Sequence, residues 1–73
     1  MINLYQAKKG QNLRVVSVPD IGLLQNLGLR EGTYVSVKNR YALGGPVLLR
    51  VEKAFSVAVG KDIATQISVK ETV

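Results

Sequence analysis

The chain has 73 residues, with ten Lys and Arg against five Asp and Glu, and it contains neither cysteine nor histidine. Disulfides, thiolate metal sites and Ser-His or Cys-His nucleophile pairs are therefore excluded. The apolar runs are too short to span a membrane, and the N-terminus "MINLYQAKKG" does not read as a signal peptide. We expect one small cytoplasmic domain over residues 1–73, whose net charge of +5 suits an anionic partner or simply a solvated surface.

The chain begins with a predicted strand and a short helix. β-Branched residues over about residues 12–18 predict the strand. In the stretch "DIGLLQNLG" the apolar residues change to helical spacing. Asp20 is a suitable N-cap of this helix, and Gly28 suits the position after its end, where the backbone turns left-handed.

The glycines of "LGLREG", residues 27–32, could belong to a phosphate-binding loop, but their position argues against one. In a phosphate loop the glycines precede a helix and aim its N–H groups at the anion, whereas Gly28 follows a helix. Their spacing also matches neither of the common nucleotide-binding motifs. We therefore assign Gly28 and Gly32 to structural turns and predict a positive φ at Gly32.

Residues 33–40 and 47–51 alternate between apolar and polar side chains, which predicts an antiparallel hairpin with one face buried. A slip of one residue would turn one apolar set into water, so the pattern also predicts a register. The predicted pairs are Ser36 with Arg50, Val37 with Leu49, Lys38 with Leu48 and Arg40 with Pro46, around a loop from Tyr41 to Gly45.

The C-terminal part adds a strand at "FSVAVG", a helical turn around "KDIATQ" with Asp62 as a cap, and a last strand at "ISVKE". Short strands with tight connections predict an all-β fold, a small antiparallel barrel of about five strands with one or two short helices. The predicted core is Leu13, Val15, Leu24, Leu27, Leu29, Val35, Val37, Val47, Leu49, Val51, Phe55, Val57, Val59, Ile63, Ala64, Ile67 and Val69.

Three motifs, in this order, resemble FeoA-type proteins, the small accessory proteins of bacterial ferrous iron transport. They are L-G-L-x-x-G-x-x-V-x-V at residues 27–37, L-G-x-P at residues 43–46 and A-x-x-I-x-V at residues 64–69. Two positions depart from the family pattern: Gly45, where many members carry an acidic residue, and Gly60, where many carry arginine. These departures affect a charge-dependent contact rather than the fold.

The resemblance implies an SH3-like barrel and a cytoplasmic, non-enzymatic accessory protein. Its implied partner is the cytoplasmic GTPase-bearing part of the FeoB transporter, so membrane association would run only through the transporter. The family carries a label of transition metal ion binding, yet nothing in the spacing of the five acids brings oxygen ligands together. Two of them, Asp20 and Asp62, are assigned to helix caps. We therefore predict no metal site, no cofactor and no catalytic residue.

The loop "YALGGP" is the candidate partner-binding site. Large apolar residues near its tip suggest a protein contact, which Leu48 and Tyr34 on the outer face could extend. Basic residues on the flanking strands would form a rim that steers the domain to an acidic surface. A simpler alternative is that Gly44, Gly45 and Pro46 form only a permissive turn. The predicted partner-binding residues are Lys38, Arg40, Tyr41, Leu43, Gly44, Gly45, Leu48 and Arg50.

Two other classes of function stay open. Small basic barrels also bind RNA or single strands, usually through aromatic residues set in a positive groove. Aromatic residues are few in this chain, and Phe55 is predicted to face the core, so no nucleic acid partner is expected. A structural or self-associating module is the third class.

Overall fold

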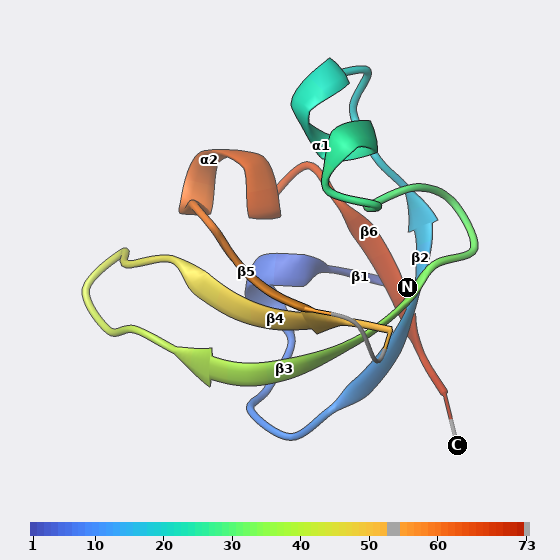
Figure 1. Ribbon diagram of the computed structural model, residues 1–73. Coiled ribbons are helices and arrows are strands. Elements are labelled where there is room, and N and C mark those ends of the chain that lie inside the picture. The colour runs from blue at the N-terminus through green and yellow to red at the C-terminus, as the bar shows by residue number, and fades with distance from the viewer. Residues whose placement is uncertain (53–54, 73) are drawn as a thin grey trace.

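A strongly bent antiparallel sheet forms most of the molecule (Figure 1). The computed structural model describes residues 1–52 and 55–72, and within them the sheet has six strands in the order β1-β6-β2-β3-β4-β5. The all-β prediction is confirmed, and β1 is the strand that the sequence pattern did not reveal. In chain order the elements are β1 (Ile2–Asn3), the 3-10 helix η1 (Leu4–Gln6), β2 (Asn12–Ser17), α1 (Gly22–Asn26), β3 (Tyr34–Arg40), β4 (Val47–Val51), β5 (Phe55–Val59), α2 (Lys61–Ala64) and β6 (Ser68–Glu71).

Local hydrogen bonds order the N-terminal segment. The Asn3 side-chain oxygen accepts a hydrogen bond from the Gln6 N–H at 3.0 Å, and the Gln6 side-chain oxygen accepts one from the Asn3 N–H at 3.1 Å. This reciprocal capping box starts η1. Leu4 and Ala7 are buried, and η1 lies against α2. The segment therefore belongs to the folded core and brings its aromatic residue, Tyr5, next to α2.

The β3–β4 hairpin follows the predicted register up to Val37 and then shifts. The observed pairs are Val35 with Val51, Ser36 with Arg50, Val37 with Leu49, Asn39 with Leu48 and Arg40 with Val47. The predictions for Ser36 and Val37 are confirmed, whereas those for Lys38 and Arg40 are wrong, because a β-bulge inserts Lys38 as an extra residue in β3. Residues directly opposite each other share a face of the sheet, so the bulge turns Arg40 toward the side of the buried Val47.

Helix α1 ends as predicted. The Leu29 N–H donates to the Leu24 carbonyl at 2.9 Å, and the Gly28 N–H donates to the Gln25 carbonyl at 3.0 Å. These two bonds form a Schellman motif, which requires a left-handed residue after the helix. Gly28 has a φ of 78° and Gly32 a φ of 91°, so both assignments to left-handed turns are confirmed.

The starts of the two α-helices differ from the prediction. The N-cap of α1 is Ile21 rather than Asp20, because the Ile21 N–H turns back to the Pro19 carbonyl at 2.8 Å before the helix begins. The N-cap of α2 is Gly60, and Asp62 lies in the first turn instead, where its charge still favours the helix N-terminus. Among the described residues, no helix is long and apolar enough to cross a membrane.

The core is built from alternate residues of the strands, joined by residues of α1, α2 and η1. Leu27, Val57 and Ile63, predicted as core, are only half-buried. Phe55 is 43% exposed, so its assignment to the core is wrong: it begins β5 at the edge of the sheet, with its ring near Gly28. The buried apolar residues are Leu4, Ala7, Leu13, Val15, Leu24, Leu29, Val35, Val37, Val47, Leu49, Val51, Val59, Ala64, Ile67 and Val69.

Candidate functional site

The β3–β4 loop, Tyr41 to Pro46, is a tight and well-defined turn. The Tyr41 N–H donates to the Pro46 carbonyl at 3.2 Å, and inside this bond the Gly45 N–H donates to the Ala42 carbonyl at 3.2 Å. The two residues at the tip are both left-handed, Leu43 with a φ of 60° and Gly44 with a φ of 79°. Two consecutive positive φ values at the centre of a four-residue turn are typical of a type I′ turn.

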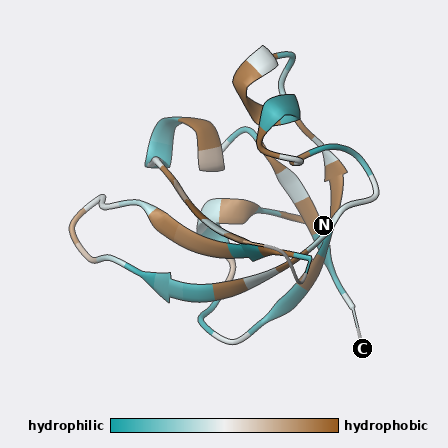
Figure 2. Ribbon diagram, in the orientation of Figure 1, coloured by the Kyte–Doolittle hydropathy of each residue, from teal (hydrophilic) through white to brown (hydrophobic). Residues whose placement is uncertain are grey.

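Leu43 is an unfavourable residue for its position in two respects. Its side chain is fully exposed, with a relative exposure of 105%. Figure 2 shows the hydrophobic stretch at the tip of the loop, on the left of the view. The left-handed backbone also favours Asn, Asp or Gly, and costs another L-residue about 1 kcal/mol. Neither hydration nor backbone conformation explains a leucine at this position.

Gly45 has a structural role in the loop. A Cβ atom built on Gly45 would lie 2.7 Å from the Tyr41 Cβ and 3.1 Å from the Tyr41 carbonyl oxygen. Any side chain would therefore push Tyr41 aside and open the loop. The absence of an acidic residue at this position follows from the close packing of Tyr41, and Gly45 shapes the site without presenting a side chain to a partner.

Two cations lie beside the loop on one tyrosine. Arg40 donates a hydrogen bond to the Tyr5 carbonyl oxygen, and its guanidinium carbon is 5.4 Å from the centroid of the Tyr5 ring. The Lys61 Nζ is 5.5 Å from the same centroid. Sequence reasoning identified Arg40 but missed Tyr5 and Lys61, because only the fold brings η1 and α2 to the end of β3.

Some predicted residues lie away from the tip. Tyr34 begins β3, and at about 3.3 Å per residue it is roughly 20 Å from Tyr41. The proposal that Tyr34 extends the apolar patch is therefore wrong. Leu48 is half-buried and contributes little, whereas Lys38 and Arg50 are exposed on β3 and β4.

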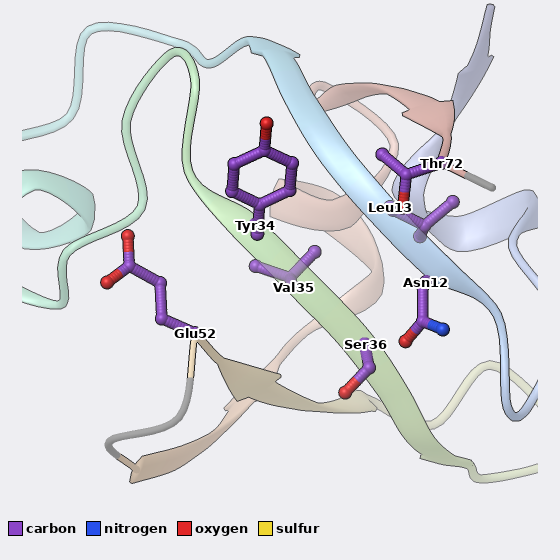
Figure 3. Close-up of a pocket in the computed structure, with 7 residues that line it drawn as sticks. All are labelled: Asn12, Leu13, Tyr34, Val35, Ser36, Glu52 and Thr72. Atoms are coloured by element: carbon purple, nitrogen blue, oxygen red, sulfur yellow. The ribbon is translucent and has the colours of Figure 1, made fainter.

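Tyr34 instead lines a shallow depression of about 260 Å³ with Glu52, Asn12 and Thr72 (Figure 3). This is smaller than most ligand pockets, which span about 300–1,000 Å³. Within residues 1–52 and 55–72, no three His, Cys, Asp or Glu side chains are grouped so that they could hold a metal ion. The loop therefore remains the candidate site.

The model of the FeoA domain matches residues 2–71. The chain belongs to the FeoA domain family. Solved structures show that the SH3-like fold is shared. An iron uptake regulatory protein (FeoA) is 24% identical, with a TM-score of 0.86 and coverage of 97% of this chain and 96% of that chain. The FeoA protein from Chlorobium tepidum is also 24% identical, with a TM-score of 0.86 and coverage of 99% and 71%.

The same fold occurs inside larger proteins. A manganese-dependent transcriptional repressor, solved in complex with manganese, is 18% identical with a TM-score of 0.89, covering 97% of this FeoA domain but 36% of the repressor. No curated protein sequence gives a significant match. At these identities the structural likeness establishes the fold alone, so the functional argument depends on the loop and on membership of the FeoA domain family.

Proposed function

We propose that this FeoA domain is a small, non-enzymatic accessory protein of ferrous iron uptake that acts in the cytoplasm. In this proposal the β3–β4 loop docks on the cytoplasmic GTPase-bearing region of an FeoB-type transporter. Support for the link to iron comes from the family and from the related iron uptake regulatory protein. The observation that carries the docking site is Leu43, exposed and left-handed at the tip of a hydrogen-bonded loop.

Binding of a partner would bury the Leu43 side chain and so remove the free-energy cost of its exposure. Burying a leucine side chain in an apolar pocket is worth about 1.5–3 kcal/mol. The hydrogen bonds of the turn add to this, because a loop that is ordered before binding loses little conformational entropy on binding. Backbone strain at an exposed residue is also typical of functional positions. Glu52 is left-handed as well, but its side chain is polar and needs no partner to cover it. Leu43 therefore has the properties of an interface anchor.

The test is an NMR titration of labelled protein with the transporter's cytoplasmic domain, with and without guanine nucleotide. We expect the resonances of Leu43 and Gly44 to shift, and Leu43→Asn to weaken binding by about 2 kcal/mol, or roughly 30-fold. Leu23 in α1 is also apolar and 63% exposed, so Leu23→Asn is the matched control and should bind like the wild type. Full-strength binding by Leu43→Asn would overturn the docking site.

A parallel titration with a short RNA tests the competing assignment. A stacking platform needs several free aromatic faces along one groove, whereas two cations lie over the Tyr5 ring. Of the other aromatic residues, all exposed, Tyr34 and Phe55 lie at the opposite end of the hairpin from Tyr41. We expect no saturable RNA binding. Micromolar RNA binding that Leu43→Asn leaves unchanged would replace the proposed function with a nucleic-acid one.

A further inference from the structure

Arg40 and Lys61 converge on the Tyr5 ring from different parts of the chain. Arg40 ends β3, Lys61 begins α2, and Tyr5 lies in η1, so only the folded chain assembles the group. Both cations are exposed at their ends and lie 5.4 Å and 5.5 Å from the ring centroid. The hydrogen bond from Arg40 to the Tyr5 carbonyl holds the guanidinium in place. We call this group the cation pair.

The charge of the cation pair is not neutralised by hydrogen bonds within the part of the chain that the structure describes. The Arg40 guanidinium bonds to a carbonyl oxygen, and no carboxylate there accepts a hydrogen bond from Arg40 or Lys61. Asp62 follows Lys61, but the bonds at Asp62 are accepted by its backbone carbonyl. Two positive charges beside one ring create a positive potential at this surface, which favours the binding of an anion.

The cation pair adjoins the tip of the β3–β4 loop. A Cβ atom built on Gly44 would lie 4.0 Å from the Lys61 Cδ, so the aliphatic stem of Lys61 runs next to the residue that follows Leu43. In Figure 1, α2 lies above β4, on the side of the molecule that carries this loop. The cation pair therefore adjoins the residue that follows the exposed Leu43.

We propose that the cation pair receives a carboxylate of the docking partner, an Asp or Glu side chain beside the apolar pocket that takes Leu43. This inference rests on the proposed docking function and adds the chemistry of the partner's surface. Carboxylates form charge-assisted hydrogen bonds with guanidinium and ammonium groups, and the ring holds both cations in position. The sequence pattern predicted a basic rim of Lys38, Arg40 and Arg50. This proposal retains Arg40 and adds Lys61, because both lie beside the Tyr5 ring.

A protein carboxylate fits the cation pair better than RNA or lipid. An RNA base would have to displace the cations to stack on Tyr5. An anionic lipid surface is bound by clusters of about four to eight cations, and the group on Tyr5 is a pair. One leucine beside two cations is a small site, and one acidic side chain next to one apolar pocket on a protein surface would be enough to occupy it.

The first test is charge reversal at Lys61 with a matched control. Lys61→Glu should weaken binding of the transporter's cytoplasmic domain about five- to tenfold, and the loss should shrink at high salt. Lys70→Glu makes the same change of charge in β6, near the C-terminus and across the molecule from the loop (Figure 1), and should bind like the wild type. Equal weakening by both variants would show that only net charge matters and would overturn the proposal.

A second titration separates this inference from the proposed function. Labelled protein is mixed with oligoglutamate, with a short RNA and with phosphatidylserine vesicles. We expect oligoglutamate to shift the Tyr5, Arg40 and Lys61 resonances saturably, and Lys61→Glu to abolish these shifts. Tighter binding of RNA or vesicles at the same residues would overturn the assignment to a protein carboxylate.

The outcomes of the two titrations are distinguishable. If oligoglutamate binds at Tyr5 and the transporter domain does not bind at all, the proposed function fails and carboxylate binding by the cation pair is supported. If Leu43→Asn abolishes transporter binding and Lys61→Glu leaves it unchanged, carboxylate binding by the cation pair is contradicted and the proposed function is supported.

Discussion

The turn at residues 28–33 and the β3–β4 loop share a left-handed backbone but differ in the residues that adopt it. In the first turn both left-handed positions are glycines, Gly28 and Gly32. The buried Thr33 hydroxyl donates to the Gly28 carbonyl at 3.0 Å and accepts from the Arg30 N–H at 3.3 Å. In the loop, the corresponding positions are Gly44 and an exposed Leu43.

This difference separates what the fold needs from what a partner needs. In the first turn Gly28 and Gly32 adopt the left-handed backbone without strain, and Thr33 satisfies its hydrogen bonds. Leu43 raises it on both counts, backbone strain and apolar exposure. A position where the residue opposes folding, inside a loop that is otherwise well formed, points to a requirement outside the fold.

The largest expected effect tests the loop side of the comparison. Leu43→Glu should weaken binding of the transporter's cytoplasmic domain by about 2 kcal/mol or more, because a carboxylate cannot enter an apolar pocket. The free energy of unfolding should change by less than about 0.5 kcal/mol, as at other exposed sites. Calorimetric titration and chemical denaturation measure the two quantities, and unfolding of the variant would place Leu43 in the core.

The next effect tests the two hydrogen bonds by which Thr33 holds the first turn. Thr33→Val keeps the size of the buried side chain but removes both hydrogen bonds of the hydroxyl. We expect a loss of about 1–2 kcal/mol in unfolding free energy, because the Gly28 carbonyl is left without its partner. Urea denaturation measures the change. A variant as stable as the wild type would mean that the hydroxyl does not hold the turn.

Glycine itself is tested at Gly28. A Cβ there would meet Phe55 and Val51 at 3.8 Å, an ordinary contact, so Gly28→Ala should destabilise through backbone strain alone, by about 1 kcal/mol or more. Gly22→Ala is the control, because Gly22 has no positive φ and its Cβ would meet nothing within 4 Å. The control should be neutral or stabilising. A higher melting temperature for Gly28→Ala would contradict the left-handed geometry.

A smaller effect, an increase in the free energy of unfolding, is expected for another substitution of Leu43. Leu43→Asn places an asparagine before Gly44, the residue pair that a type I′ turn prefers. We expect the unfolding free energy to rise by about 0.5 kcal/mol, while binding of the transporter domain falls. The two signs together would show that the leucine serves binding at the expense of stability, whereas a destabilised Leu43→Asn would mean that Leu43 contributes to the fold.

The smallest expected effect concerns metal. With no cysteine or histidine and with scattered carboxylates, the protein should not bind ferrous iron or zinc with micromolar affinity, and it should not hydrolyse nucleotides. Anaerobic calorimetry with each metal, and a phosphate-release assay, measure these properties. Stoichiometric metal binding would overturn the assignment of the acids to the surface and to the first turn of α2.

The sequence pattern predicted the structure correctly where residues close together in the chain determine it. The alternation in β3 and β4 predicted the pair Val37–Leu49, and the glycine after a helical repeat predicted the left-handed turn at Gly28. The start of α1 was missed because a backbone hydrogen bond from Ile21 to Pro19 competes with the cap expected at Asp20.

The basic side of the candidate site could not be predicted, for a physical reason. The face of β3 on which Arg40 lies depends on the bulge at Lys38. With the bulge, Arg40 donates its hydrogen bond to Tyr5, a contact between distant parts of the chain that forms only in the folded state. Lys61 reaches the same ring from α2, more than fifty residues along the chain from Tyr5. Such long-range convergence leaves no local periodic signal.

The bulge at Lys38 also bears on how partner preference could diverge between related domains. In regular pairing Lys38 would lie opposite Leu48 and Arg40 opposite Pro46, so Arg40 would move to the opposite face of β3, away from Tyr5, while the loop itself kept every amino acid. The presence or absence of the bulge thus determines which side of the hairpin carries the positive charge of Arg40. Relatives with identical loop tips can then favour different surfaces, and loop sequence alone is a poor guide to shared specificity.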